Sequence, residues 1–415
     1  MHLMRQALAM QEARRLDDAE RLYREALALQ PDEPDALHML GVIRYERNDL
    51  AEARTLVVRA LDLCQWQVAS MRQNLGLILS RERANQDTHA SVALRNRYRM
   101  MVEARIATNP AVTPLVSVVI PSFNHARFVE RALRSVFEQS YRRIELVVID
   151  DGSHDRSPAL IESVLRQSPF PHRLVARANR GAATTLNEGI AIAQGSHVQF
   201  LNSDDWFAPD RVERMVAAVA GTHSAWGFSS VEVVDAEGGL LDPMRNRSSW
   251  DLRCLLGNVP FRETVGSGFI TGNVGVSSGN LFFSRSLLEQ LGGFHEYRYN
   301  HDWDICLRAL VSSEPVFVPE RLYFYRLHAG NTIAESAGRA RAEARIVCTR
   351  YLDWACGGSP PDNPFAPTRA TWGQLFTNAV LSGGMGGLLE PESFRQLIAA
   401  PDQAGSDLPG TLPAA

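Results

Sequence analysis

Several features that would place a chain in a special class are missing from this sequence. No run approaches the roughly 18 to 20 apolar residues that a membrane-spanning helix requires. The first residues carry acids and arginines where a secretory leader has an apolar core. We therefore expect a cytoplasmic protein without a transmembrane segment, which could at most attach peripherally to the inner face of the membrane.

Cysteine is scarce, and the charges nearly balance. The 5 cysteines are scattered, odd in number and without the spacing of metal ligands, so they support neither a disulfide framework nor a zinc site. A net charge of −4 gives no bulk attraction to polyanions, and we expect no nucleic-acid partner. With 415 residues, 45% of them hydrophobic, the chain is long enough for two or three globular domains.

A helical pattern repeats in the first part of the chain. The segments that start at Asp17 and Leu50 match at an offset of 34 residues, and small alanines at paired positions allow antiparallel helices to approach closely. The matched pairs are Ala19/Ala53, Leu22/Leu56, Ala26/Ala60, Leu27/Leu61 and Leu29/Leu63. This period is similar to that of the tetratricopeptide repeat. We expect an all-α tetratricopeptide-repeat module over residues 1–86, which by resemblance would bind a protein partner; the alternative is a helical spacer that binds nothing.

Beyond a charged helical connector, expected over residues 87–113, strand and helix patterns alternate. This alternation is typical of an α/β domain with a parallel sheet. Strands are expected at 115–120, 144–149, 172–177 and 197–202, and helices at 126–139, 157–167 and 182–194. Each strand ends in a polar loop. Because the carboxyl ends of parallel strands meet at one edge of a sheet, the four loops should form one site.

Seven motifs in this region resemble those of the family 2 glycosyltransferases, which have the GT-A fold. They are VVIPSFNHARFVERALRSVFEQ, IELVVIDDGSHDRS, ANRGAATTLNEGI, FLNSDDWFAP, LLEQLGGFHE, HDWDICLR and YRLHAGNT, in the family's order across residues 115–335. Each motif alone is weak, but together they are specific. The resemblance implies a GT-A domain over residues 114–335, with a Rossmann-like, mostly parallel sheet flanked by helices.

The same resemblance implies the activity. It is that of an inverting, metal-dependent glycosyltransferase that moves a sugar from a nucleotide-diphosphate donor to a hydroxyl. UDP is the favoured nucleotide, and the acceptor would be a glycan, a lipid-linked glycan or a protein.

By resemblance, the first two loops bind the nucleotide. Pro121 and Asn124 would fix the base and the ribose, and Asp151 would accept the N3 hydrogen of uracil. The alternatives are that Pro121 and Asn124 only form a turn and that the acid caps a helix.

The third loop corresponds to the family's phosphate-binding segment. Asn179, Gly181 and Asn187 occupy the matching positions. The arginine that the family has just before the second asparagine is Leu186 here, and we expect Arg177 or Arg180 to replace it.

The fourth loop carries adjacent acids, Asp204 and Asp205, directly after a strand. Two close carboxylates repel each other unless a cation lies between them, and hard oxygen ligands suit Mg²⁺ or Mn²⁺; a solvated loop or a helix cap is the alternative. By resemblance, Asn202 would bind the ribose and Asp204 the metal, with Asp205 as second choice. His328 would complete the metal or diphosphate site, and its imidazole suits Mn²⁺ better than Mg²⁺.

The proposed catalytic base comes late in the chain. An inverting displacement needs a carboxylate within reach of the acceptor hydroxyl, and resemblance assigns this role to Asp302. The family has Glu before this Asp, whereas this chain has His301. Asp304 lies two residues further on, and the alternative is that both acids cap the following helix.

The rest of the chain is expected to form a C-terminal helical extension over residues 336–400 and a disordered tail over residues 401–415. Three departures from the family, at Leu186, Asn202 and His301, motivate a rival hypothesis of a catalytically impaired scaffold that acts through its repeats. A nucleotidyltransferase, which would release pyrophosphate, is the second rival.

Overall fold

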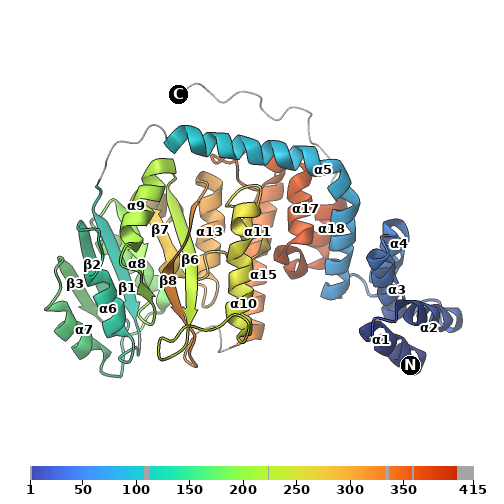
Figure 1. Cartoon of the computed structure of the whole chain (residues 1–415), viewed down its shortest axis with the longest axis horizontal. Coiled ribbons are helices and arrows are strands. Elements are labelled where there is room, and N and C mark those ends of the chain that lie inside the picture. Colours follow the sequence, from blue (N-terminus) through green and yellow to red (C-terminus); the bar gives the residue numbers. More distant parts are fainter. Residues whose placement is uncertain (1, 107–112, 223, 332–335, 358, 400–415) are drawn as a thin grey trace. The chain divides into compact units, whose positions relative to one another are not determined.

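The computed structural model describes residues 2–106, 113–222, 224–331, 336–357 and 359–399. These residues fold into two compact units (Figure 1). The first unit comprises the described residues of 1–92, 352–358 and 368–415, and the second those of 93–351 and 359–367. The tail expected at 401–415 lies outside the described residues, as do residues 107–112 of the expected connector.

The first unit begins with two pairs of consecutive helices joined by short turns. They are α1 (His2–Glu12), α2 (Leu16–Leu29), α3 (Pro34–Glu46) and α4 (Leu50–Leu63), followed by the first part of α5 (Ala69–Ile106). The repeated alanines Ala19 and Ala53 are completely buried, as the close helix packing requires. At the last matched pair the pattern fails, because Leu29 and Leu63 are 80% and 42% exposed at the ends of their helices. Helix α5 runs without a break across the limit expected at residue 86.

The C-terminal helices complete this first unit. They are α16 (Arg369–Trp372), α17 (Gln374–Ser382) and α18 (Pro391–Ala399). Arg72 of α5 donates a hydrogen bond to the Leu389 carbonyl at 2.8 Å, and the ring of Trp66 packs near that of Phe394. The segment expected as one extension over 336–400 is divided between the units, with residues 336–351 and 359–367 in the second unit. Among the helices of the described residues, none combines the length and the apolar composition needed to cross a membrane.

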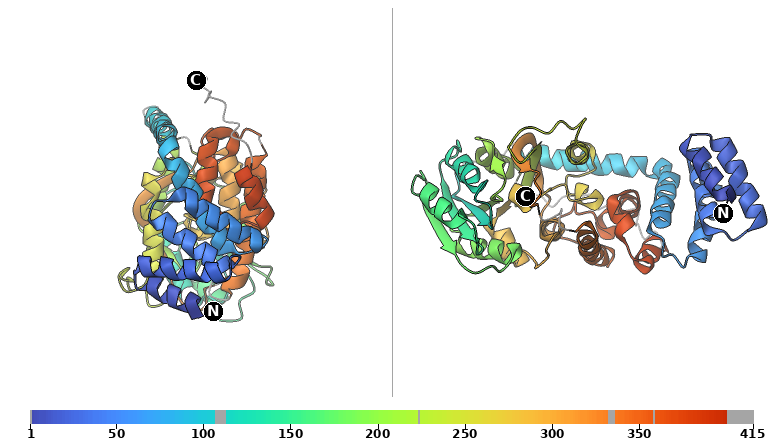
Figure 2. Two further views of the ribbon diagram at one scale, coloured as in Figure 1. Left: turned by 90° about the vertical axis from the view of Figure 1, so that its right-hand side faces the viewer. Right: turned by 90° about the horizontal axis from the view of Figure 1, so that it is seen from below.

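The second unit is built on an eight-stranded sheet in the order β3-β2-β1-β4-β7-β6-β8-β5 (Figures 1 and 2). The strands are β1 (Val116–Ser122), β2 (Ile144–Asp150), β3 (His172–Ala176), β4 (His197–Phe200), β5 (Trp206–Phe207), β6 (Trp226–Val234), β7 (Leu281–Ser284) and β8 (Val316–Arg326). Strands β3, β2, β1 and β4 are parallel, whereas β7 is antiparallel to both of its neighbours. The fold class expected from the sequence, an α/β domain next to helical repeats, is therefore confirmed, although the sheet is mixed beyond β4.

Helices connect the parallel strands. They are α6 (Val129–Phe137), α7 (Ser157–Leu165) and α8 (Ala182–Ile192), and they lie on both faces of the sheet (Figure 1). Right-handed crossovers place α6 and α7 on one face and α8 on the other, because the chain reverses direction across the sheet after β3. Ser122 pairs with Asp150, and Asp150 pairs with Ala176. The four strands therefore end at one edge, where the polar loops converge.

The rest of the second unit covers and extends this sheet. Its helices are α9 (Arg211–Thr222), α10 (Arg247–Gly257), α11 (Gly268–Thr271), α12 (Arg285–Leu291), α13 (His301–Ser312) and the first part of α15 (Ala337–Cys356). Just after α13, the buried carboxyl of Glu314 accepts hydrogen bonds from the Gly266 amide at 2.6 Å and from Asn363 Nδ2 at 3.1 Å. Burial raises the pKa of Glu314 from 4.5 to about 7.

Glu314 should make the stability of the second unit depend on pH. Because its folded-state pKa is the higher one, the folded protein binds the proton more tightly than the unfolded chain does. The free energy of unfolding should therefore fall as pH rises from about 4.5 to about 7, by about 3 kcal/mol for this group. Glu314→Gln should flatten that slope in urea unfolding measured at a series of pH values. The exposed Glu162→Gln is the control, and equal slopes in the native chain and Glu314→Gln would contradict the expectation.

Candidate active site

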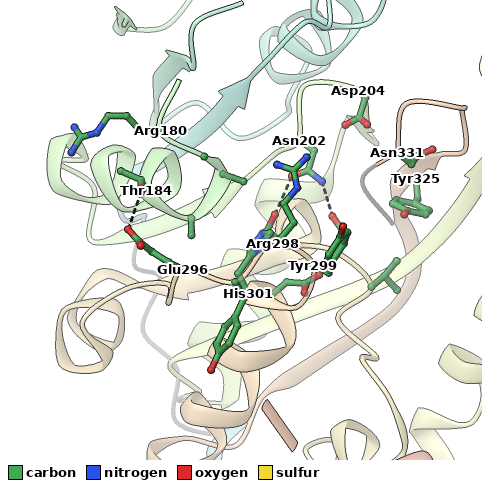
Figure 3. Close-up of a pocket in the computed structure, with 18 residues that line it drawn as sticks. Arg180, Thr184, Asn202, Asp204, Glu296, Arg298, Tyr299, His301, Tyr325 and Asn331 are labelled. Atoms are coloured by element: carbon green, nitrogen blue, oxygen red, sulfur yellow. Dashed lines mark hydrogen bonds between the residues drawn. The ribbon is translucent and has the colours of Figure 1, made fainter. Parts of the chain in front are cut away.

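Two adjoining cavities open at the edge where the parallel strands end. The larger, about 590 Å³, is lined by the loops that follow β1, β2, β3 and β4. The smaller, about 360 Å³, is lined by the start of α8, the segment 296–302 and β8 (Figure 3). Seven residues line both: Gly181, Ala182, Asn202, Asp204, Ser278, Arg298 and His301. The cavities are therefore two compartments of one site.

The residues predicted for nucleotide binding lie in the larger cavity, except one. Pro121, Asn124, Asp151, Asn179, Gly181 and Asn202 all line it. Asn187 does not, because its side chain bridges to the turn after α12. Its Oδ1 accepts from the Phe294 amide at 2.7 Å, and its Nδ2 donates to the Phe294 carbonyl at 2.8 Å.

Asn124 and the acid Asp150 organise the first two loops. Asn124 adopts a left-handed conformation with φ 54°, which asparagine tolerates, and its Oδ1 accepts from the His154 amide. The carboxylate of Asp150 accepts from the Ser153 amide and hydroxyl at 2.9 and 2.7 Å. Asp150 is thus used within its loop, which leaves Asp151 as the acid that faces the larger cavity.

Asp151 connects the second and third loops. Its carboxylate forms an ion pair with Arg177 and accepts from the amides of Arg180 and Gly181 at 2.7 and 3.0 Å. Two carboxylate oxygens offer about four acceptor positions, so one remains for a further donor. Gly181 has φ 88°, in the region that favours glycine, and it starts α8 with the helix N-terminus at both cavities.

The two adjacent acids have opposite environments. Asp205 is turned away from the cavities, and its carboxylate accepts from the Tyr323 hydroxyl and, at 2.7 Å, from the Arg326 amide. Burial, and then the charge of Asp204, raise the pKa of Asp205 well above its usual range. Asp204 lines both cavities, and its Oδ2 lies 3.0 Å from His328 Nε2. Burial alone would raise the pKa of Asp204, but the contact with His328 and the nearby His125 lower it.

His125 is the residue that the sequence analysis missed. Each of His125, Asp204 and His328 offers one ligand atom, and these atoms lie within 4.8 Å of one another. His125 Nδ1 lies 2.8 Å from the Ser203 hydroxyl, which orients the ring. Burial lowers the pKa of His125, which favours the neutral imidazole that binds metals. These three side chains therefore fit a divalent cation. The only sequence signal was the position of His125 at the end of the first polar loop.

Asp302 and Asp304 are separated by their partners. Asp304 pairs with Arg308 at 2.8 Å and with His295 at 3.0 Å, so it is used within the protein. Asp302 lines the smaller cavity together with Asp204, and its Oδ1 accepts from the following Trp303 amide. Burial raises the pKa of Asp302. The structure thus brings Asp302 and Asp204, which lie far apart in sequence, to one cavity.

The loop that precedes β7 closes the smaller cavity in a strained conformation. Val276 has φ 70°, which is unfavourable for a β-branched residue and costs about 1–3 kcal/mol. The buried amide of Asn280 holds the loop, because its Nδ2 donates to the carbonyls of Ser229 and Gly275. Ser277 Oγ accepts from Asn202 Nδ2 at 2.8 Å and so ties this loop to the fourth strand loop.

Comparison with known proteins matches two parts of the chain to known families. Residues 117–292 match the family described as "Glycosyl transferase family 2", and residues 10–63 match "Tetratricopeptide repeat". An uncharacterized glycosyltransferase of Nostoc sp. is 26% identical over 249 residues, which cover 57% of this chain and 74% of the relative. The succinoglycan biosynthesis protein ExoO of Rhizobium meliloti is 30% identical over 235 residues, 54% of this chain and 64% of the relative, which is less than two thirds of its length.

Among solved structures, a mannosyltransferase from Pyrobaculum calidifontis in complex with GDP-Man and Mn²⁺ aligns with a TM-score of 0.45 and 20% identity. This alignment covers 78% of this chain and 87% of that one. Asp302 and His328 lie beyond the segment matched by the transferase family, within the same structural unit. Residues 117–292 are therefore similar to glycosyl transferase family 2, and residues 10–63 are similar to the tetratricopeptide repeat.

Proposed function

We propose that the chain transfers a sugar, with inversion, from a nucleoside diphosphate donor to an acceptor hydroxyl, and that UDP is the preferred nucleotide. The observation that carries this proposal is the cavity shared by Asp204 and Asp302. Inversion needs the leaving group and the attacking hydroxyl on opposite sides of the sugar, and the two acids come from different elements, Asp204 from the loop after β4 and Asp302 from the start of α13.

The nucleotide occupies the larger cavity in this proposal. The remaining acceptor position of Asp151 takes the N3 hydrogen of uracil, and Pro121, Asn124 and Asn202 border the base and ribose. Asn179 and the first amides of α8 bind the diphosphate, because a helix N-terminus presents unpaired N–H groups and a partial positive charge.

His125, Asp204 and His328 would hold the divalent cation. An ion bound there would stabilise the negative charge that develops on the departing diphosphate. Two imidazoles and one carboxylate favour Mn²⁺ over Mg²⁺, which prefers oxygen ligands.

Asp302 is the proposed base. Its carboxylate takes the proton of the acceptor hydroxyl as the oxygen attacks the anomeric carbon. The same burial that raises its pKa makes it a better proton acceptor than an exposed aspartate.

Replacing the base should separate binding from chemistry. Asp302→Asn should lower kcat by about 10²- to 10⁴-fold and leave the affinity for UDP unchanged, because the base acts only on the acceptor. In the native chain the acid limb of the pH profile should lie above 3.8, since protonated Asp302 cannot act, and the variant should lose that limb. Release of UDP from UDP-sugars with Mn²⁺ is the measurement. Turnover in Asp302→Asn at the native rate would contradict the role of Asp302 as the base. Release of pyrophosphate by the native chain would instead indicate a nucleotidyltransferase.

The metal prediction has a readout that does not need turnover. Mn²⁺ should raise the melting temperature more than Mg²⁺ at equal concentration, because it binds the folded state more tightly. His125→Gln should weaken Mn²⁺ binding by about tenfold or more, measured by titration calorimetry. His172→Gln is the matched control, since His172 is exposed on β3 and lines neither cavity. Unchanged Mn²⁺ affinity in His125→Gln would remove that residue from the site.

Asn187 stabilises the fold in this proposal instead of binding phosphate. Asn187→Ala removes two hydrogen bonds to Phe294 and should lower the free energy of unfolding by about 1–3 kcal/mol, without changing the affinity for UDP. Asn179→Ala, at the larger cavity, should weaken UDP binding and leave the free energy of unfolding unchanged. Denaturant unfolding and UDP titration of both variants measure the difference. Weaker UDP binding by Asn187→Ala at unchanged stability would restore its role as a phosphate ligand.

A further inference from the structure

The proposed site lacks one positive charge that the family uses at the diphosphate. The buried Leu186 stands in the place of that arginine. The sequence contains no lysine, so only arginine or histidine can replace it. Arg177 is already committed, because it pairs with Asp151 and Glu188 and donates to Thr185 Oγ1. Arg180 extends away from Asn202 and Asp204 (Figure 3).

Arg298 lies where this charge is needed. It lines both cavities, as Asp204 does, and its side chain extends toward Asn202 (Figure 3). The larger cavity is lined by the residues proposed to bind the nucleotide, and the smaller one by the proposed catalytic base, Asp302. In a nucleoside diphosphate sugar the diphosphate joins the nucleoside to the sugar. A residue shared by the two cavities is therefore placed to contact the diphosphate.

The backbone that carries Arg298 is held by one carboxylate. Glu343 of α15 accepts from the amides of Arg298, Tyr299 and Asn300 at 2.7, 2.6 and 2.7 Å. The Asn300 side chain adds a hydrogen bond to the Ala340 carbonyl at 2.9 Å. Hydrogen bonds to an ionised acceptor are stronger than neutral ones, so three of them on one carboxylate fix the segment firmly.

We propose that Arg298 binds the diphosphate of the donor and that Glu343 is the residue that positions it. A guanidinium can donate two parallel hydrogen bonds to a phosphate, which a lysine cannot do. This inference rests on the proposed function, because it needs a nucleoside diphosphate in the larger cavity. In this chain, the arginine that contacts the diphosphate would then come from the segment before α13 and not from α8.

The test compares ligands with and without the diphosphate, with Mn²⁺ present. Arg298→Gln should weaken UDP binding by about 10- to 100-fold, because a hydrogen-bonded charge pair is lost, and should leave the weak binding of uridine unchanged. The affinity of Arg298→Lys for UDP should fall between those of the native chain and Arg298→Gln. Arg298 is exposed, so these variants should fold with an unchanged melting temperature. Arg166→Gln controls for the loss of a surface charge.

Glu343 is tested through Arg298. Glu343→Ala should weaken UDP binding in the native background and have little further effect in Arg298→Gln, because the two residues act as one unit. Equal losses in both backgrounds would mean that Glu343 acts only on the fold, and would overturn its positioning role.

The outcomes separate this inference from the function on which it rests. A native chain that binds neither UDP nor GDP would contradict the proposed function itself. UDP binding that survives in Arg298→Gln, or that is lost in Arg180→Gln instead, would overturn the assignment of Arg298 and leave the function standing.

Discussion

The site depends on two neighbouring carboxylates that face in opposite directions. Asp205 is fixed by the Tyr323 hydroxyl and the Arg326 amide, so the end of β4 is tied to β8, which enters the sheet more than a hundred residues later. That connection places His328, two residues beyond β8, against Asp204. A carboxylate buried without such donors would be strongly destabilising, so the partners of Asp205 are what allow Asp204 to face the cavity. The geometry of the proposed cation-binding residues is therefore a consequence of how the sheet is joined.

The fold class and the convergence of the four loops could be predicted from the sequence, because both follow from local patterns. Alternation of strand and helix predicts where the loops of β1 to β4 meet, and it brought Asn124, Asp151 and Asp204 to one edge. The order 3-2-1-4 and the mixed half of the sheet were not predictable in the same way. Strand β5 has only two residues, too few to give a periodic signal.

What the sequence could not give is the direction of individual side chains. Asn187 fits the motif, yet its amide bridges to Phe294, whose backbone is 107 residues away in sequence. His125 had no distinguishing pattern, and it became a candidate ligand only when the fold placed it near Asp204 and His328. Asp302 and Asp304 likewise differ in role because Arg308 and His295 form ion pairs with Asp304. Such choices are made by long-range partners that no single motif contains.

The first unit is assembled from both ends of the chain, with α1 to α4 and the start of α5 at one end and α16 to α18 at the other. Arg72 cannot meet the Leu389 carbonyl until residue 389 has been synthesised, which is later than every residue of the second unit. The second unit, residues 93–351 and 359–367, has all its residues available earlier. During synthesis, the contacts of α5 with the C-terminal helices should consequently be the last to form. A ribosome that stops before α17 would leave the α5 surface around Gly76, against which Leu381 of α17 packs, open to chaperones.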